Sequence, residues 1–115
     1  MFERVAWSEE AERGLNETFR DSGADPVREM IEKGTAELWR INHGESWMVT
    51  RLEGSELNVI CLQGKDIHPV AEQVIAHARS QGIESVRFHT LWRGLGRMLE
   101  RHGFELVDLI YRARV

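Results

Sequence analysis

The chain has 115 residues, of which 42% are apolar, enough for one domain with a modest hydrophobic core. Charged residues make up 30% and are well mixed along the chain, which argues against disorder. The net charge of -4 argues weakly against general nucleic-acid binding, because the phosphate backbone attracts basic surfaces. No apolar run approaches membrane-spanning length and the N-terminus does not resemble a signal peptide, so we expect a cytoplasmic protein with no membrane partner.

The first third of the chain predicts two short helices. Residues 2–7 are either a short strand or a lead-in segment. Ser8 has the chemistry of an N-cap, and the apolar spacing that follows predicts a helix over residues 9–20. Asp25-Pro26 then supplies a cap and a first-turn proline for a second helix, which Gly34 ends.

The next part of the chain has a pattern typical of strands. Residues 36–41 and 46–52 are rich in β-type residues, and the segment Asn42-His43-Gly44-Glu45 between them predicts a hairpin. A turn at residues 53–56 leads into an apolar run over residues 57–62. This run is too short for a packed helix and predicts a strand buried on both faces. The three strands are therefore expected to form an antiparallel meander.

A long segment after this strand has apolar residues at spacings of three and four, which marks one face of a helix. Asp66 can cap this helix, Pro69 falls in its first turn and Gly82 is placed to end it. A further apolar run over residues 85–90 predicts another strand. The order strand, helix, strand predicts a right-handed βαβ crossover with parallel strands.

The C-terminal part predicts one more helix and one more strand. The helix covers about residues 92–102, with Leu95, Met98 and Leu99 on its inner face. The last strand covers residues 105–113.

This order of elements resembles the GNAT superfamily of acyl-CoA N-acyltransferases, in which a helix ending in Gly-Phe precedes the last strands. Here Gly103-Phe104 follows the segment Arg93-Gly94-Leu95-Gly96-Arg97-Met98-Leu99-Glu100-Arg101-His102. The resemblance covers about residues 8–113 and is strongest for short, divergent members from bacteriophages and prophages. It implies an α/β (α+β) fold with a mixed central sheet and flanking helices, formed by a single GNAT-like domain over residues 1–115. It also implies acetyl-CoA or another acyl-CoA as the cofactor.

In that family the fourth strand and the next helix hold acyl-CoA, and a Gln/Arg-x-x-Gly-x-Gly/Ala loop offers backbone N–H groups to the pyrophosphate. Gln63 matches the first position of this loop, whereas Asp66 and His68 occupy the two small-residue positions. Gly64 and Lys65 are the nearest partial substitutes. The cofactor contacts that the resemblance implies are Leu62, Gln63, Gly64, Lys65, His68, Arg93 and Arg97.

Arg93 and Arg97 belong to a row that continues with Arg101, at every fourth residue of the last predicted helix. One interpretation is a solvated helix face opposite the apolar stripe. The other is a basic ridge that contacts the nucleotide phosphates of CoA or an acidic partner.

The catalytic candidates are His89 and Tyr111. Many family members have an Asn at the start of the last helix and a Tyr general acid before Gly-Phe, but Trp92 and Leu99 hold these positions here and neither can donate that proton. Tyr111 on the last strand is a candidate replacement, and His89, at the carboxyl end of its strand, is the candidate general base. A packing or structural role is the alternative for both.

Other reactive side chains predict no site. Cys61 cannot form an internal disulfide and falls in a predicted central strand, so we expect a small buried hydrophobe rather than a reactive thiol. The five histidines lack the spacing of metal ligands, so no metal site is predicted.

The sequence is compatible with two functions. The first is a divergent acyl-CoA-dependent N-acyltransferase of weak activity, such as an acetyltransferase, acting on an unidentified amine or protein acceptor. The alternative is a catalytically inactive GNAT-like binding or assembly module encoded by a phage. A homodimer is compatible with either function.

Overall fold

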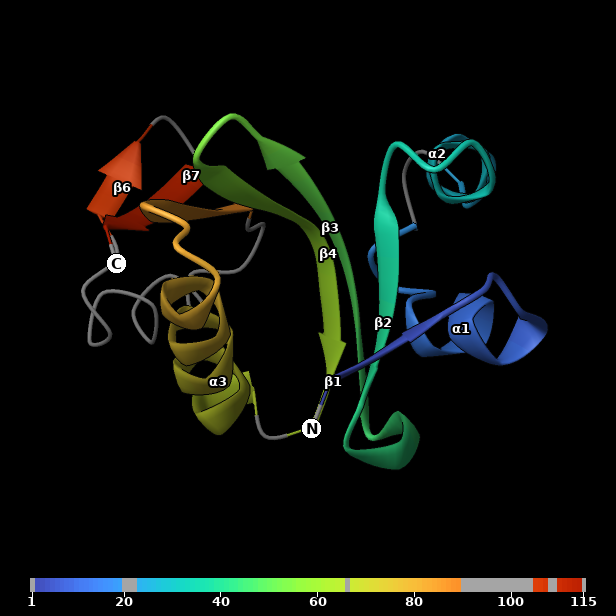
Figure 1. Ribbon diagram of the computed structural model, residues 1–115. Helices are drawn as coiled ribbons and strands as arrows, with labels where there is room; N and C mark the ends of the chain where they lie inside the picture. The colour runs from blue at the N-terminus through green and yellow to red at the C-terminus, as the bar shows by residue number, and fades with distance from the viewer. Residues whose placement is uncertain (1, 20–22, 66, 90–104, 108–109, 115) are drawn as a thin grey trace. The chain divides into compact units, whose positions relative to one another are not determined.

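The strands form a mixed sheet in the order β1-β2-β3-β4-β5-β7-β6 (Figure 1). β4 and β5 pair in parallel, whereas β1 with β2 and β5 with β7 pair antiparallel. The computed structural model describes residues 2–19, 23–65, 67–89, 105–107 and 110–114. Its contacts divide the chain into two units, Met1–Arg51 with Ile60–Lys65, and Leu52–Val59 with Asp66–Val115. The predicted fold class, a mixed sheet with flanking helices, is confirmed.

The first unit begins with a strand, so the strand interpretation of the N-terminal segment is confirmed. β1 (Phe2–Val5) pairs antiparallel with β2 (Glu37–Ile41), which pairs antiparallel with β3 (Ser46–Glu53). The predicted hairpin turn is the short 3-10 segment η1 (Asn42–Gly44). Asn42 and His43 there have positive φ angles of 50° and 61°, a conformation that Asn tolerates better than most residues.

α1 (Glu9–Gly14) starts as predicted, because the Ser8 hydroxyl accepts a hydrogen bond from the backbone N–H of Ala11 at 3.1 Å. The predicted end at residue 20 is wrong. In a continuing helix, the N–H groups of Glu17 and Thr18 would donate to carbonyls four residues earlier. Instead Glu17 donates to the side-chain oxygen of Gln63, and Thr18 donates to the Leu15 carbonyl at 3.0 Å and to the same Gln63 oxygen at 3.4 Å. A local turn and a contact from a distant part of the chain thus replace the next helical turn.

α2 (Asp25–Glu32) corrects the predicted cap. Ala24 is the N-cap residue and makes no side-chain hydrogen bond to the helix. Asp25 is the first helical residue, where its negative charge suits the helix dipole without capping it. Pro26 lies in the first turn as predicted, and Gly34 beyond the last turn has a φ of +78°.

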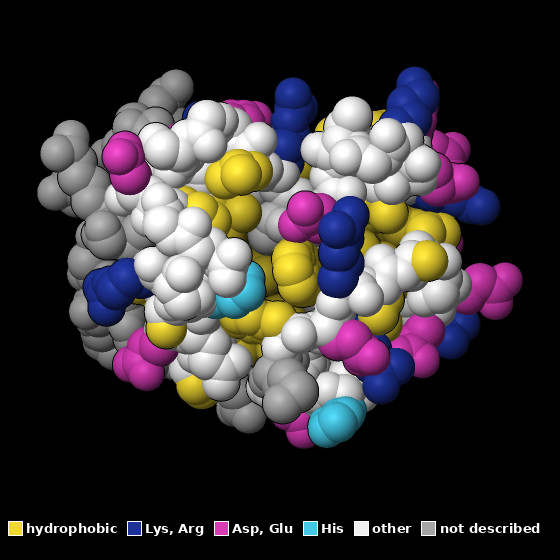
Figure 2. Space-filling model, viewed as in Figure 1, with side chains coloured by type: hydrophobic (Ala, Val, Ile, Leu, Met, Phe, Trp, Pro, Cys, Tyr) yellow, Lys and Arg dark blue, Asp and Glu magenta, His cyan; other side chains and the backbone are white. Residues whose placement is uncertain are grey.

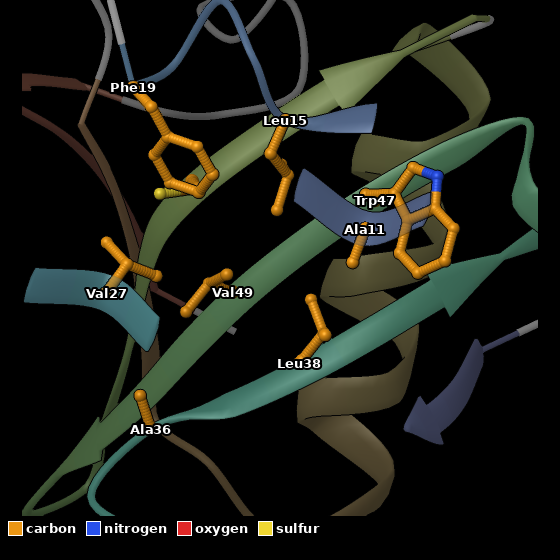
Figure 3. Close-up of a cluster of buried hydrophobic side chains, with 9 residues drawn as sticks. Ala11, Leu15, Phe19, Val27, Ala36, Leu38, Trp47 and Val49 are labelled. Atoms are coloured by element: carbon orange, nitrogen blue, oxygen red, sulfur yellow. The ribbon is translucent and has the colours of Figure 1, made fainter. Parts of the chain in front are cut away.

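The core of the first unit lies between its two helices and strands β2, β3 and β4. Figure 3 shows side chains of α1 and α2 pointing toward β2 and β3. Gly14 is required for this packing, because a Cβ atom there would overlap the indole ring of Trp47. The buried members of this core are Ala11, Leu15, Phe19, Val27, Ala36, Leu38, Trp47, Val49 and Cys61.

The predicted βαβ crossover is confirmed. β4 (Glu56–Gly64) is followed by α3 (Ile67–Ser80) and β5 (Ser85–His89), and β5 pairs parallel with β4. The inward stripe of α3 is buried as its spacing predicts, at Val70, Ala71, Val74 and Ala78. Gly82 after the helix has a φ of +73°, whereas the predicted cap Asp66 lies outside the described residues.

The single last strand predicted over residues 105–113 is wrong. Two strands occupy this part of the chain, β6 (Glu105–Val107) and β7 (Ile110–Arg114), and they pair antiparallel with each other. β7 also pairs antiparallel with β5. The sequence signal for a break is weak here, because neither Gly nor Pro separates the two strands. The predicted helix over residues 92–102 lies outside the described residues.

The visible surface carries charges of both signs. In Figure 2, Lys and Arg side chains are interspersed with Asp and Glu on the face shown. In the described part of the chain, no helix is long and apolar enough to cross a membrane.

Candidate functional site

Gly64, the last residue of β4, is held against the start of β3. Its φ is +148°, and a Cβ atom there would overlap Cα and Oγ of Ser46 and lie 2.5 Å from the carbonyl oxygen of Glu45. Only glycine fits this position without a shift of backbone. The close approach that Gly64 permits is therefore to the protein's own chain.

Lys65, the next residue, is fixed by its backbone to the same two residues. Its N–H donates to the carbonyl of Glu45 at 3.1 Å, and its carbonyl accepts from the Ser46 hydroxyl at 2.8 Å. This N–H is therefore already used and is not available to a phosphate. The side chain of Lys65 is exposed, so a contact with an anion would come from its ammonium group.

Gln63 uses both the oxygen and the nitrogen of its side-chain amide to hold the segment after α1. Its Oε1 accepts from the N–H of Glu17 at 2.9 Å and of Thr18 at 3.4 Å, and its Nε2 donates to Oδ1 of Asn16 at 2.9 Å. The sequence identified this residue through the cofactor loop of the family. In the structure the side chain instead joins the end of β4 to the segment after α1.

We expect Gln63→Ala to increase hydrogen exchange most at the amide of Glu17, which loses its acceptor, and less at Thr18, whose N–H also donates to the Leu15 carbonyl at 3.0 Å. The loss in unfolding free energy should be about 1–2 kcal/mol. Exchange measured by NMR is the direct test, with Gln73→Ala on the exposed face of α3 as the matched control. Gln63→Glu keeps the acceptor and should retain most of the protection. Unchanged exchange at both amides in Gln63→Ala would contradict the assigned role.

The two residues before Gln63 offer no reactive group. Leu62 is half-buried, and Cys61 is buried in the core of the first unit. Burial raises the pKa of the Cys61 thiol, although a hydrogen bond with the Thr18 side chain acts in the opposite direction. The thiol therefore stays protonated at neutral pH, in agreement with the expected role as a small hydrophobe.

The start of α3 is a weaker anion site than the family pattern implies. The first turn of a helix normally presents unpaired N–H groups to an anion. α3 begins at Ile67, so His68 is its second residue and Pro69 its third. Since proline has no N–H, the first turn offers one donor fewer.

The two catalytic candidates lie on neighbouring strands of the second unit, His89 at the end of β5 and Tyr111 on β7. In the antiparallel pairing of β5 with β7, Tyr111 is opposite Phe88 and His89 is opposite Ile110. The backbone register thus offsets the two residues by one position along the paired strands. Arg93 and Arg97 lie outside the described residues.

A cluster of charges that the sequence analysis did not identify lies on β4, β5 and the last residue of β3. The Arg87 guanidinium lies 2.6 Å from Glu53 and 3.5 Å from Glu56. The Ser85 hydroxyl donates to Glu56 at 2.7 Å. Asn58, only 7% exposed, donates to Glu53 at 3.5 Å, and its side-chain oxygen has no hydrogen-bond partner among the described residues.

The signal for this cluster was present in the alternation of polar residues. Glu56 is opposite Ser85 and Asn58 is opposite Arg87 in the parallel register. Within the described ranges, no group of three or more His, Cys, Asp or Glu side chains could hold a metal ion.

No family model matches the sequence, and no curated protein matches it either. The fold, in contrast, is similar to solved acetyltransferase structures. An acetyltransferase from Bacillus subtilis, solved in complex with CoA, has a TM-score of 0.74 at 10% identity, covering 99% of this chain and 97% of that one. A GNAT-family acetyltransferase from Staphylococcus aureus has a TM-score of 0.67 at 15% identity and covers 99% of both chains.

An agmatine N-acetyltransferase has a TM-score of 0.72 at 10% identity, with 100% of this chain and 99% of that chain covered. Identities this low show the fold alone. The chain has the fold of the GNAT acetyltransferases.

Proposed function

We propose that this chain is an acyl-CoA-dependent N-acyltransferase of the GNAT type. The observation that carries the proposal is the end-to-end fold match, which pairs 99% of this chain with 97% of a CoA-bound acetyltransferase. Because so little of either chain is left over, the likeness concerns the same elements in the same order. The acceptor proposed is a primary amine, on a small molecule or on a protein.

The edge of β4 supports a binding role for this strand. In the described part of the chain, β4 pairs with β5 only from Glu56 to Val59, yet β4 continues to Gly64. The backbone groups of residues 60–64 on that edge are therefore not used by β5. An extended ligand that carries amide groups can pair with such an edge as an added strand does. The arm of acyl-CoA has this chemistry, so we place it along residues 60–64 of β4.

Two residues, one in each unit, have proposed roles in binding and transfer. The Lys65 ammonium, exposed at the end of β4, would neutralise a phosphate of the cofactor. His89, at the end of β5, would accept a proton from the acceptor amine. Tyr111 on β7 stays a candidate proton donor. Leu62, Gly64 and His68 would contribute backbone groups or contacts only.

Two observations favour the second candidate, a GNAT-like module that binds a partner without acyl transfer. The N–H of Lys65 is already donated to Glu45. Pro69 removes a donor from the first turn of α3. Both reduce the number of backbone donors for a pyrophosphate. The bacteriophage or prophage origin, the cytoplasmic location and the homodimer stay predictions from the sequence.

Calorimetric titration with acetyl-CoA distinguishes the two functions. We expect saturable binding by the wild type, and a loss of roughly three- to fivefold in affinity for Lys65→Gln, as for one exposed ionic contact. Lys33→Gln is the matched control, because Lys33 is an exposed lysine that pairs with Glu29 on α2. Both variants should melt as the wild type does. No detectable binding by the wild type would reject the acyltransferase and leave the binding module.

Turnover is then measured as thiol release with a panel of primary amines. His89→Ala should lower turnover at unchanged acetyl-CoA affinity, since a general base acts in the chemical step. Binding of acetyl-CoA without transfer to any amine would support the second candidate.

A further inference from the structure

β1 is the last strand at one end of the sheet, so only one of its edges is paired. Within the described ranges, no strand pairs with the other edge. The middle residues of β1, Glu3 and Arg4, are exposed, whereas Phe2 and Val5 are half-buried. The N–H and C=O groups on an open edge can pair with an added extended chain. β1 therefore offers the first unit an edge to which another strand can be added.

A cavity of about 510 Å³ lies beside the end of β1. The residues that line it all belong to the first unit: 4–7, 31–32 and 36–38. Val5 and Leu38 are opposed in the β1–β2 register, so their side chains point to the same face of the sheet. Val5, Trp7 and Ile31 are half-buried and pack against the core of the first unit. The cavity is thus apolar on the face of Val5, and a side chain opposite Val5 on an added strand would lie next to it.

The side chains of β1 alternate between the two faces of the sheet. Glu3 is on the face of Val5 and the cavity, whereas Phe2 and Arg4 are on the opposite face. There the ring of Phe2 packs on Trp39, with centroids 6.4 Å apart. An added strand would therefore meet, from Val5 back to Phe2, an apolar, a basic, an acidic and an apolar residue. Each face of the edge presents one charge and one apolar group.

A second copy of β1 does not suit this edge. Along one strand, the backbone groups of every second residue point to a given edge, and opposed residues in an antiparallel pair both point to the shared edge or both away from it. Two copies related by a two-fold axis therefore oppose Glu3 to Glu3, or Arg4 to Arg4, in the registers that overlap most of the strand. Like charges placed directly opposite each other destabilise the pairing. The order of charges thus favours a different chain over self-association.

We propose that β1 binds an extended segment of another protein as an added antiparallel strand, and that this segment has the order apolar, acidic, basic, apolar. The first apolar side chain would lie opposite Val5 and enter the cavity. The acidic residue would pair with Arg4 and the basic residue with Glu3. The last apolar residue would pack beside Phe2. This surface is separate from acyl-CoA binding and does not depend on it.

The two charges of β1 select the order of the segment and contribute little of its affinity. Ion pairs at exposed positions are weak, whereas backbone pairing along an edge and a filled apolar pocket are the usual sources of affinity in strand addition. Glu3 also lies 3.4 Å from Arg40, but its side chain is 60% exposed, which leaves room for a second cation.

NMR titration of the full chain with short peptides tests the proposal. The first probe is the acetylated and amidated hexapeptide Thr-Leu-Glu-Lys-Val-Thr, in which the threonines favour an extended backbone. We expect weak, saturable binding with shifted amides in residues 2–7 and 31–32. The outward-facing amides of β1 should exchange more slowly in the complex, because each gains an acceptor. Replacing Leu by Ala in the peptide should weaken binding about tenfold, since the cavity then stays unfilled.

The charge order is tested with a second peptide, Thr-Leu-Lys-Lys-Val-Thr. The wild type should bind the first peptide about fivefold more tightly, although its net charge of -4 attracts the more basic peptide at long range. Arg4→Glu should reverse this preference, because Glu3 and the new carboxylate would each face a lysine. Arg13→Glu, at an exposed position on α1, changes the net charge equally and should keep the wild-type preference.

Four results would overturn the proposal. The first two are no saturable binding of the first peptide, and shifts or protection confined to residues outside β1 and the cavity lining. The third is a preference between the two peptides that Arg4→Glu leaves unchanged. The fourth is a wild-type dimer in sedimentation that the first peptide disperses, which would assign the edge of β1 to a second copy of this chain.

Discussion

Val74→Asp should prevent folding of the second unit. Val74 is 1% exposed on the buried stripe of α3, together with Val70, Ala71 and Ala78. A carboxylate there would lose its hydration, and the buried stripe supplies only apolar neighbours along the helix. We expect a loss of about 4 kcal/mol or more, comparable with the whole stability of a small domain. Thermal melting followed by circular dichroism measures the effect.

Gln73→Asp is the matched control for this prediction. It places the same side chain next to Val74 in the same helix, but at an exposed position. Its cost should be a few tenths of a kcal/mol, from helix propensity alone. A melting temperature for Val74→Asp equal to that of Gln73→Asp would show that the buried face of α3 is assigned wrongly.

The βαβ crossover and the meander could be predicted because their signals are local. The stripe of α3 repeats at three and four residues, and glycines with positive φ, such as Gly54 and Gly82, mark turns. The same use of local spacing predicted a helix over residues 9–20, whereas α1 ends at Gly14. Gln63, whose side chain accepts from the Glu17 N–H, lies 46 positions further along the chain. The spacing of residues near α1 therefore could not predict this contact.

The site could be predicted in outline only. The family pattern identified Gln63, Gly64 and Lys65 as a group, and they do follow one another at the end of β4. It could not show that Glu45 and Ser46 already occupy the backbone of Lys65. The pairing of Arg87 with Glu53 and Glu56 was missed because residues 53–56 were interpreted as a turn and residues 85–90 as an apolar run.

Gly64→Ala should strongly destabilise the first unit, because it adds a methyl group where β4 lies against the start of β3. The new Cβ would overlap Cα of Ser46, and backbone cannot rotate away as a flexible side chain can. The φ of +148° adds strain for any residue with a side chain. Overpacking and strain together should cost about 3 kcal/mol or more, which lowers the melting temperature by roughly 10–15 °C.

Gly82→Ala separates crowding from backbone strain. Gly82 also has a positive φ, +73°, but no atom lies within 4 Å of a Cβ built there. Its cost should therefore be the strain alone, about 1 kcal/mol. The excess of Gly64→Ala over Gly82→Ala measures how tightly the end of β4 is held to the start of β3. Equal losses would contradict the close approach of Gly64 to Ser46. Acetyl-CoA titration below both melting temperatures then tests the proposed function, because displacing the end of β4 moves Lys65, and only Gly64→Ala should weaken binding.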